Sequence, residues 1–480
     1  MQSAVDCSKP GCSFWPSLGL PQGNVDDWQF VAGVLPALHA DQLTQGETRW
    51  RIPPLLSEIV AKAFLAGEMM VDPMVARASK ALGHPWRWLR PLAQRFGAAH
   101  AGQTRPRERD AIQFLDADRG FRWVRVRYSR QLRLTRWILE SHRMQPVSAA
   151  AAWRVPAIES AGALAEWLSL SAGELEWFAD LKGLLAHGAC SPQLQHYNYR
   201  VLTKESSGVR LIEAPKRRLK ELQVRILTDI LDRIPVHPAS HGFVKGRSIQ
   251  TFVAPHAGQR VVLKMDLQDF FPTFCGARIQ TFFRTVGYPE SVADLLGGIC
   301  TNVAPRRLGR GLELYARPHL PQGAPSSPAL ANLCAYRVDC RLTGLAKAAG
   351  ARYTRYADDL AFSGGKEFER CVERFSIHVA SILQEEGFAV HHRKTRVMRQ
   401  GVRQYMAGLV VNERANVVRE DFDRLKATLT NCARLGPENQ NREGHANFRK
   451  HLEGRVGFVE MINADKGNRL RAILERIQWG

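Results

Sequence analysis

A pair of adjacent aspartates between two short apolar segments constrains the fold of this chain more than any other feature. Residues 352–357 and 360–363 have the aromatic and apolar composition of β-strands, and Asp358 and Asp359 separate them. Aspartate favours tight turns because its carboxylate accepts hydrogen bonds from nearby backbone. The pattern therefore predicts a β-hairpin whose turn presents two carboxylates.

A third carboxylate extends this pattern. Asp266 ends the apolar segment 261–266, which also has the composition of a strand. Acids at strand ends project from rigid backbone, and two divalent ions about 4 Å apart need oxygen ligands from at least two such segments. Asp266, Asp358 and Asp359 are therefore the candidate catalytic and metal-binding residues. An Asp-Asp turn alone also forms for structural reasons, but Tyr-Ala-Asp-Asp is expected by chance in about one of several hundred chains of this length.

The charge of the chain indicates a polyanionic partner. Lysine and arginine number 67 and aspartate and glutamate 46, which gives a formal charge of +21. Nucleic acid is the commonest partner of such a chain, and a basic protein without one is the alternative. Residues 105–143 contain eleven arginines and no lysine, interleaved with aromatic residues. Guanidinium groups bind phosphates and stack on bases, so Arg122, Arg125 and Arg127 are candidate RNA contacts, with a solvated basic face as the alternative.

Composition also limits the cellular class of the chain. Its 480 residues, 45% of them hydrophobic, predict two or three folded domains. No run of 18 apolar residues occurs, and the first 25 residues lack a basic start followed by an apolar stretch, so neither a membrane span nor a secretory signal is expected. Nine cysteines without a Cys-x-x-Cys pair indicate reduced thiols. We therefore expect a cytoplasmic protein without a membrane partner.

The spacing of apolar residues divides the chain into five segments. Residues 1–45, rich in Pro, Gly and Ser, are expected to be loosely ordered, 46–150 to form a basic helical extension, and 151–195 a helical linker. Residues 196–412 alternate strands with helices, including a hairpin of 199–202 with 209–212 and a helix over 219–234. Residues 413–480 have helical periodicity. The fold class is therefore α+β with helical ends.

Six segments resemble, in order, the sequence blocks of reverse transcriptases, and among these the bacterial retron type. The blocks are Arg210–Pro215, His241–Ile249, Met265–Pro272, Leu320–Pro328, Tyr356–Asp359 and Gly387–Thr395. The resemblance implies a right-hand polymerase with fingers and palm over 196–412 and a helical thumb over 413–480, preceded by the mainly helical N-terminal extension. It also implies that Asp266, Asp358 and Asp359 hold two Mg²⁺, or Mn²⁺, for nucleotidyl transfer.

The same resemblance implies a set of contacts to the incoming deoxynucleoside triphosphate. These nucleotide-binding residues are Lys204, Arg210, Phe271, Gln322 and Lys394. Phe271 corresponds to an aromatic gate that leaves no room for a 2′-hydroxyl, with a core phenylalanine as the alternative. Lys204, Arg210 and Lys394 have a solvated surface charge as the alternative.

The chain departs from the retron pattern in two places. Retron enzymes carry Asn-Ala-x-x-His after the Gly-Arg-Ser block, whereas residues 252–256 here are Phe-Val-Ala-Pro-His. His256 alone matches, and it is either an RNA contact or a satisfied core histidine. Retron enzymes also carry Val-Thr-Gly where this chain has Met406-Ala407-Gly408.

The implied activity is RNA-directed DNA polymerisation of retron type. A cognate structured noncoding RNA would serve as template and primer, and the product would be a branched, RNA-linked single-stranded DNA. The implied partners are this RNA, the RNA–DNA hybrid, deoxynucleoside triphosphates and a defence effector protein that acts with the enzyme against phage. The alternatives are another bacterial reverse transcriptase, of the intron-encoded or abortive-infection type, and a non-catalytic RNA-binding protein.

Overall fold

The structure, a computed structural model, describes residues 55–66, 69–101, 106–129, 131–135, 144, 146, 148–184, 195–203, 209–305, 308 and 313–479. The segment 1–45, expected to be loosely ordered, lies outside these residues. Contacts divide the chain into two compact units, Met1–Glu140 and Ser141–Gly480. Within the described ranges no helix combines the length and the apolar character needed to cross a bilayer.

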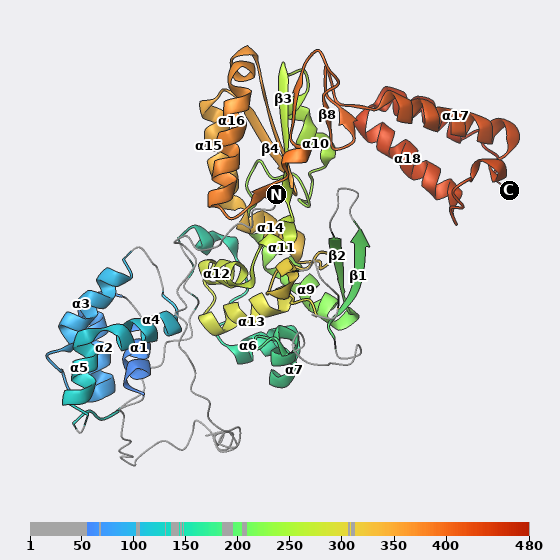
Figure 1. Cartoon of the computed structure of the whole chain (residues 1–480). Coiled ribbons are helices and arrows are strands. Elements are labelled where there is room, and N and C mark those ends of the chain that lie inside the picture. The colour runs from blue at the N-terminus through green and yellow to red at the C-terminus, as the bar shows by residue number, and fades with distance from the viewer. Residues whose placement is uncertain are drawn as a thin grey trace. The chain divides into compact units, whose positions relative to one another are not determined.

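The described part of the first unit is helical (Figure 1). Its helices are α1 (Leu56–Leu65), α2 (Val71–Leu82), α3 (Leu89–Ala99), α4 (Glu108–Ala117) and α5 (Arg119–Arg127). Apolar residues at helical spacing form its core, in which the Phe64 and Phe96 rings lie 5.3 Å apart. Asp118 begins α5 because its carboxylate accepts a hydrogen bond from the backbone N–H of Phe121 at 2.7 Å.

The second unit mixes helices with three small sheets. Its elements before the longest strand are α6 (Ala161–Leu168), α7 (Ala172–Ala179), β1 (Tyr197–Thr203), β2 (Val209–Pro215), α9 (Arg217–Asp229) and α10 (Ile249–Val253). The next are β3 (Val261–Gln268), α11 (Phe270–Thr273), α12 (Gly276–Val286), α13 (Glu290–Cys300), α14 (Ser327–Cys334), α15 (Tyr336–Ala348), β4 (Arg352–Tyr356), β5 (Asp359–Gly364) and α16 (Lys366–Glu385). The last are β6 (Ala389–Val390), β7 (Arg396–Arg399), β8 (Tyr405–Met406), β9 (Leu409–Val410), β10 (Asn416–Val417), α17 (Arg419–Leu435), α18 (Phe448–Ile462) and α19 (Ala464–Leu474).

The central sheet has five strands, and β3 lies inside it. Strand β5 pairs with one edge of β3 and with β4, while β7 and β6 pair with the other edge, all antiparallel. Alternate residues of β3 divide between two cores. Val261, Leu263 and Met265 join the large cluster that includes α15 and α16, whereas Val262 joins the cluster of the C-terminal helices. Figure 1 shows α15 and α16 beside the sheet. Asp266 therefore leaves β3 on the face opposite these two helices.

The acidic hairpin forms as expected, but its turn is one residue earlier. Tyr356 pairs with Asp359, so the two turn residues are Ala357 and Asp358, and Asp359 is the first residue of β5. Ala357 has a φ of 54°, which matches the first central position of a type II′ hairpin turn, where glycine is usual. The expectation that both aspartates lie in the turn is therefore wrong, because strand pairing extends to Asp359.

The segments on either side of the sheet also contribute to packed cores. Leu164, Leu168 and Leu175, from the expected helical linker 151–195, are buried in the same cluster as the sheet. Helices α17, α18 and α19 pack with β8, β9 and β10 in a separate cluster. The hairpin of β1 with β2 is as expected, and the helix expected over 219–234 begins earlier, at Arg217, and ends at Asp229 before a short 3₁₀ turn, Leu231–Arg233.

Candidate active site

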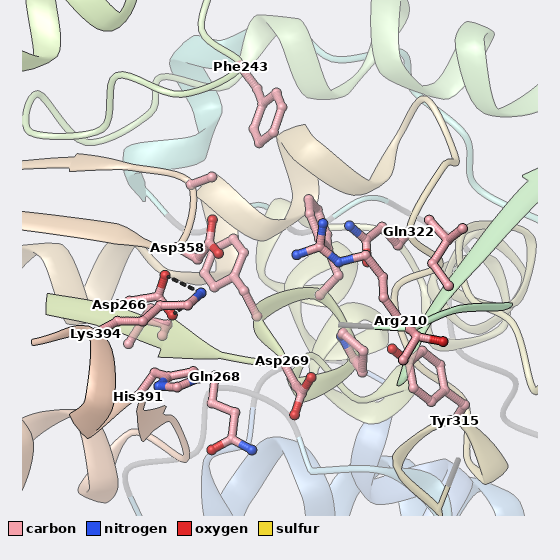
Figure 2. Close-up of a pocket in the computed structure, with 17 residues that line it drawn as sticks. Arg210, Phe243, Asp266, Gln268, Asp269, Tyr315, Gln322, Asp358, His391 and Lys394 are labelled. Carbon is pink, nitrogen blue, oxygen red and sulfur yellow. Dashed lines mark hydrogen bonds and ion pairs between the residues drawn. The ribbon is translucent and has the colours of Figure 1, made fainter. Parts of the chain in front are cut away.

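A cavity of about 580 Å³ opens where the C-terminal end of β3 meets the acidic hairpin. Segments far apart in the sequence line it, as Figure 2 shows. The predicted site residues among its lining are Arg210, Asp266, Phe271, Gln322, Asp358 and Lys394. In Figure 2 the carboxylates of Asp266 and Asp358 lie on one side of the cavity and Arg210 and Gln322 on the other. The cavity therefore unites two of the three predicted metal ligands, Asp266 and Asp358, with four of the five predicted nucleotide contacts, whereas Asp359 is not among its lining residues.

The strand register brings the three aspartates together. Asp266 and Asp359 are opposite each other on β3 and β5, so their side chains leave the sheet on the same face. Asp358 precedes Asp359 in the turn and lines the cavity. The pKa of Asp358 is raised, first because the carboxyl is buried and then because Asp359 and Asp266 add negative charge nearby. Three carboxylates thus act on one another across the hairpin.

Two lysines balance this negative charge. Lys394 Nζ lies 3.2 Å and 3.1 Å from the two carboxylate oxygens of Asp266. Lys264 Nζ lies 3.0 Å from Asp359 Oδ1, although this buried oxygen accepts no hydrogen bond of good geometry from the described residues. Lys264 precedes Asp266 by two residues on β3 and so projects from the same face.

The carboxylate group fits a divalent-cation site in its chemistry. Asp266, Asp358 and Asp359 supply the oxygen ligands that Mg²⁺ prefers, and Asp359 holds a buried oxygen in need of a partner. Among the described residues, no three His, Cys, Asp or Glu side chains are already arranged to hold a metal ion. In this arrangement the ammonium groups of Lys394 and Lys264 lie beside the oxygens of Asp266 and Asp359 that would hold an ion.

The opposite side of the cavity is held by a buried polar network. The carbonyl oxygen of Gln322 accepts a hydrogen bond from the backbone N–H of Glu213 at 2.9 Å. The buried Glu213 carboxylate in turn lies 2.9 Å from His319 Nε2, and Asn302 donates to it at 2.8 Å. Gly323 has a φ of 135°, and a Cβ there would lie 2.7 Å from the carbonyl oxygen of Glu213. The loop of Gln322 is thus fixed against β2, the strand that carries Arg210.

Aromatic rings form another part of the cavity lining. Phe271 is half-buried, and its ring lies 6.2 Å from that of Phe243 and 5.5 Å from that of Phe270. Phe243, Tyr315 and Asp269 also line the cavity, and none of them was among the predicted site residues. Asp269 had a recognisable signal, because it is a second acid three residues after Asp266. Phe243 lies within the block His241–Ile249, which gave no indication of its own role, and Tyr315 lies outside all six blocks, so only the tertiary fold brings it to the site.

A buried ion pair lies beside the acidic hairpin and donates a hydrogen bond to its turn. Arg355 and Asp339 are both fully buried, and the guanidinium donates to both carboxylate oxygens, at 2.8 Å and 2.6 Å. Arg355 also donates to Asn332 Oδ1 at 3.0 Å and to the carbonyl oxygen of Ala357 at 3.2 Å. These bonds satisfy a buried charge and hold the turn residue with positive φ.

Of the two alternatives predicted for His256, the structure shows the core histidine and not the RNA contact. It is fully buried, with Nδ1 2.6 Å from Ser363 Oγ and Nε2 2.7 Å from Thr354 Oγ1. Thr354 donates its only hydroxyl proton to the carbonyl oxygen of Phe252, so it accepts a bond from Nε2–H and leaves Nδ1 as an acceptor. Burial lowers the pKa of His256 to about 3, with smaller contributions from the charges of Arg352 and His241. A neutral histidine thus ties β4 to β5.

The remaining predicted contacts lie elsewhere in the chain. Lys204 lies outside the described residues. In the first unit Arg122 and Arg127 are exposed on α5, whereas Arg125 is half-buried and lies 2.6 Å from Asp116 Oδ1. Two of these three arginines therefore have the exposure that a contact with RNA requires.

Comparisons with known proteins show the family of the chain. Residues 202–418 match the family described as reverse transcriptase (RNA-dependent DNA polymerase). The chain is 44% identical over 282 residues to the retron Mx65 reverse transcriptase of Myxococcus xanthus, covering 58% of this chain and 64% of that protein. It is 37% identical over 340 residues to the retron Mx162 enzyme of the same organism, covering 67% of each. A third relative, the retron Ec86 reverse transcriptase of Escherichia coli, is 30% identical over 289 residues, which are 59% of this chain and 82% of that enzyme. The chain belongs to the retron reverse transcriptases, a family of RNA-directed DNA polymerases.

Two solved structures resemble the fold distantly. A foamy viral protease-reverse transcriptase in complex with an RNA/DNA hybrid is 16% identical with a TM-score of 0.30, covering 59% of this chain and 33% of that one. Apo telomerase from Candida tropicalis is 11% identical with a TM-score of 0.31, covering 73% of each chain.

Proposed function

We propose that this protein copies an RNA template into DNA at the cavity between β3 and the acidic hairpin. The observation that carries the proposal is the register of β3 with β5, which sets Asp266 opposite Asp359 beside the Asp358 turn. On this account Asp266, Asp358 and Asp359 hold two Mg²⁺. Such ions, when bound, lower the pKa of the attacking primer hydroxyl and neutralise charge on the departing phosphates.

The residues across the cavity would bind the incoming deoxynucleotide. Arg210 offers a forked guanidinium for the triphosphate, and Gln322 lies on a loop that is fixed to the strand of Arg210. Phe271 would exclude a 2′-hydroxyl. Lys394, released from Asp266 when a cation binds there, would place its ammonium proton near the departing pyrophosphate.

The arrangement of parts and the biological role are proposed on the family relationship. Residues 196–412 would form fingers and palm and α17, α18 and α19 a thumb, with 46–150 as an N-terminal extension whose arginines bind RNA. The template would be a cognate noncoding RNA, and the product a branched, RNA-linked single-stranded DNA that acts with an effector protein in antiphage defence. The relatives named above are retron reverse transcriptases, and this supports the retron type over intron-encoded and abortive-infection enzymes.

Removal of two carboxylates tests the proposal. The variant Asp358→Asn with Asp359→Asn should lose DNA synthesis by at least about 10³-fold, because the site would lack most of its metal-binding charge. Primer extension on an RNA template measures this loss, and binding of the same template–primer should change little. The matched control is Asp232→Asn, which removes an exposed carboxylate outside the cavity. Undiminished synthesis by the double variant would exclude the proposed chemistry.

A further inference from the structure

A second cavity, in the first unit, is lined almost wholly by aromatic side chains. Its volume is about 490 Å³, within the range of small-ligand sites. The segment between α2 and α3 and one end of α5 supply the residues that line it. They include His84, Trp86, Arg87, Trp88, Trp123 and Tyr128.

The rings of this cavity form a connected group. The Trp86 ring lies 5.2 Å from both His84 and Tyr128, and the Trp123 ring lies 6.0 Å from Tyr128. Trp123 is 58% exposed, so packing of its large ring contributes little to the stability of the first unit. The indole nitrogens of Trp86 and Trp88 are buried and have no acceptor among the described residues. The cavity thus offers flat aromatic faces that are open to a ligand.

The surroundings of the cavity are positively charged. Arg87 belongs to its lining, and Arg119, Arg122 and Arg127 are exposed on α5. These four guanidinium groups have no acidic partner among the described residues, in contrast to Arg125, which pairs with Asp116. Arg119 and Arg127 are each four residues from Trp123 and therefore lie on the same side of α5 as this ring. A ligand that fills the cavity therefore meets aromatic faces, Arg87 in the lining and positive charge on the neighbouring surface of α5.

We propose that this aromatic cavity binds an unpaired nucleobase of single-stranded nucleic acid, with the surrounding arginines on the neighbouring phosphates. A base has two flat faces for stacking and a negative charge on each adjoining phosphate, which match the aromatic lining and the arginines of the site. The site lies in a different compact unit from the polymerase cavity, and binding there does not depend on the proposed polymerase chemistry.

Crosslinking of the full-length chain tests this inference. The probe is a hexauridylate that carries one 5-iodouridine, irradiated with the protein, and the attachment site is located by mass spectrometry. Attachment to Trp123 or Tyr128 is expected. Trp123→Ala should lower the yield at this site about ten-fold, since loss of a stacking ring weakens base binding by roughly 5- to 150-fold. A hexamer of the same charge with abasic sugars should compete poorly.

The controls separate this site from the polymerase site. Val126→Ala removes another exposed apolar side chain of α5, 80% exposed and outside the cavity lining, and should leave crosslinking unchanged. The Asp358→Asn, Asp359→Asn variant should also retain the crosslink while losing synthesis. Attachment only to residues 196–480, or equal yields from Trp123→Ala and the wild type, would overturn the inference, as would equal competition by the abasic hexamer. The same negative results are expected if the cavity binds a peptide or another ligand in place of a nucleobase, and they would overturn the inference.

Discussion

At the scale of single residues, the neighbours of each carboxylate and of Phe271 define the polymerase cavity. Asp266 faces Lys394, and Asp359 faces Lys264, so each of these two carboxylates has a lysine ammonium group within 3.2 Å. Phe271 faces the cavity and the ring of Phe243. The sequence alone identified the carboxylates, Lys394 and Phe271 because they lie in recognisable blocks. It did not identify Lys264, whose role depends on strand register, or Phe243, which lies in the block His241–Ile249 but reaches the cavity through a loop conformation with positive φ.

Replacement of Phe271 tests the gate at this scale. Phe271→Ala should admit ribonucleotides, because the ring that occupies the space of the 2′-hydroxyl is removed. The ratio of UTP to dTTP incorporation on an RNA template should rise by at least about ten-fold, a change of roughly 1.4 kcal/mol in discrimination. Phe282→Ala, a half-buried phenylalanine outside the cavity, is the control. A Phe271→Ala enzyme that still rejects UTP would show that this ring packs without selecting the sugar.

At the scale of elements, the acidic hairpin depends on neighbours that hold a strained turn. The positive φ of Ala357 costs about 1 kcal/mol or more and is supported by the bond from Arg355. Both strands were predictable from their composition. The turn was placed one residue late, because composition does not show that Tyr356 pairs with Asp359. The buried Arg355–Asp339 pair was also invisible, since arginine normally indicates an exposed position.

A substitution in the loop before α10 tests how precisely the turn of the acidic hairpin must be positioned. A Cβ at Gly242 would lie 2.6 Å from the backbone nitrogen of Ala357, so Gly242→Ala must displace the turn that carries Asp358. Synthesis should fall by about ten- to one hundred-fold, because small displacements of catalytic groups cost this much. Gly365→Ala introduces the same methyl group beside β5 with no atom within 4 Å and should be nearly neutral. Equal rates for the two variants in primer extension would contradict the close contact.

The histidine between β4 and β5 predicts a dependence of stability on pH. The pKa of His256 is lowered to about 3 in the folded chain, against about 6.5 when unfolded. Below pH 6.5 the unfolded state binds a proton at this residue and the folded state does not. Its contribution to the free energy of unfolding is therefore complete above pH 6.5 and declines as pH falls, approaching about 1.4 kcal/mol per pH unit.

Urea unfolding at pH 7.5, 6.5 and 5.5 measures this effect. The difference in stability between the wild type and His256→Gln should shrink as pH falls. His241, whose pKa is lowered to about 4, is present in both proteins and so cancels. A difference that stays constant with pH would mean that His256 is not held neutral in the core.

At the scale of the whole molecule, the chain has two compact units, the first with an aromatic cavity and the second with a cavity that contains carboxylates. The sequence predicted a basic helical region before a mixed α+β region; the structure places helices α1 to α5 in the first unit and the β3 sheet in the second. It did not predict the aromatic cavity of the first unit, because His84 and Trp86 lie in the segment between α2 and α3 and Trp123 lies in α5, and only packing brings the two segments together. Sites whose residues lie in recognisable sequence blocks were predictable in this chain even across long separations, as for Asp266 and Asp359, whereas a site without such blocks was not.

The central claim is that three aspartates of the second unit bind a pair of divalent ions, and counting bound Mn²⁺ tests it most directly. With an RNA template, a chain-terminated primer and the next deoxynucleotide present, paramagnetic resonance should show about two tightly bound Mn²⁺ per wild-type chain. The Asp358→Asn, Asp359→Asn variant should bind none or one. Two bound ions in that variant, or none in the wild type, would contradict the account.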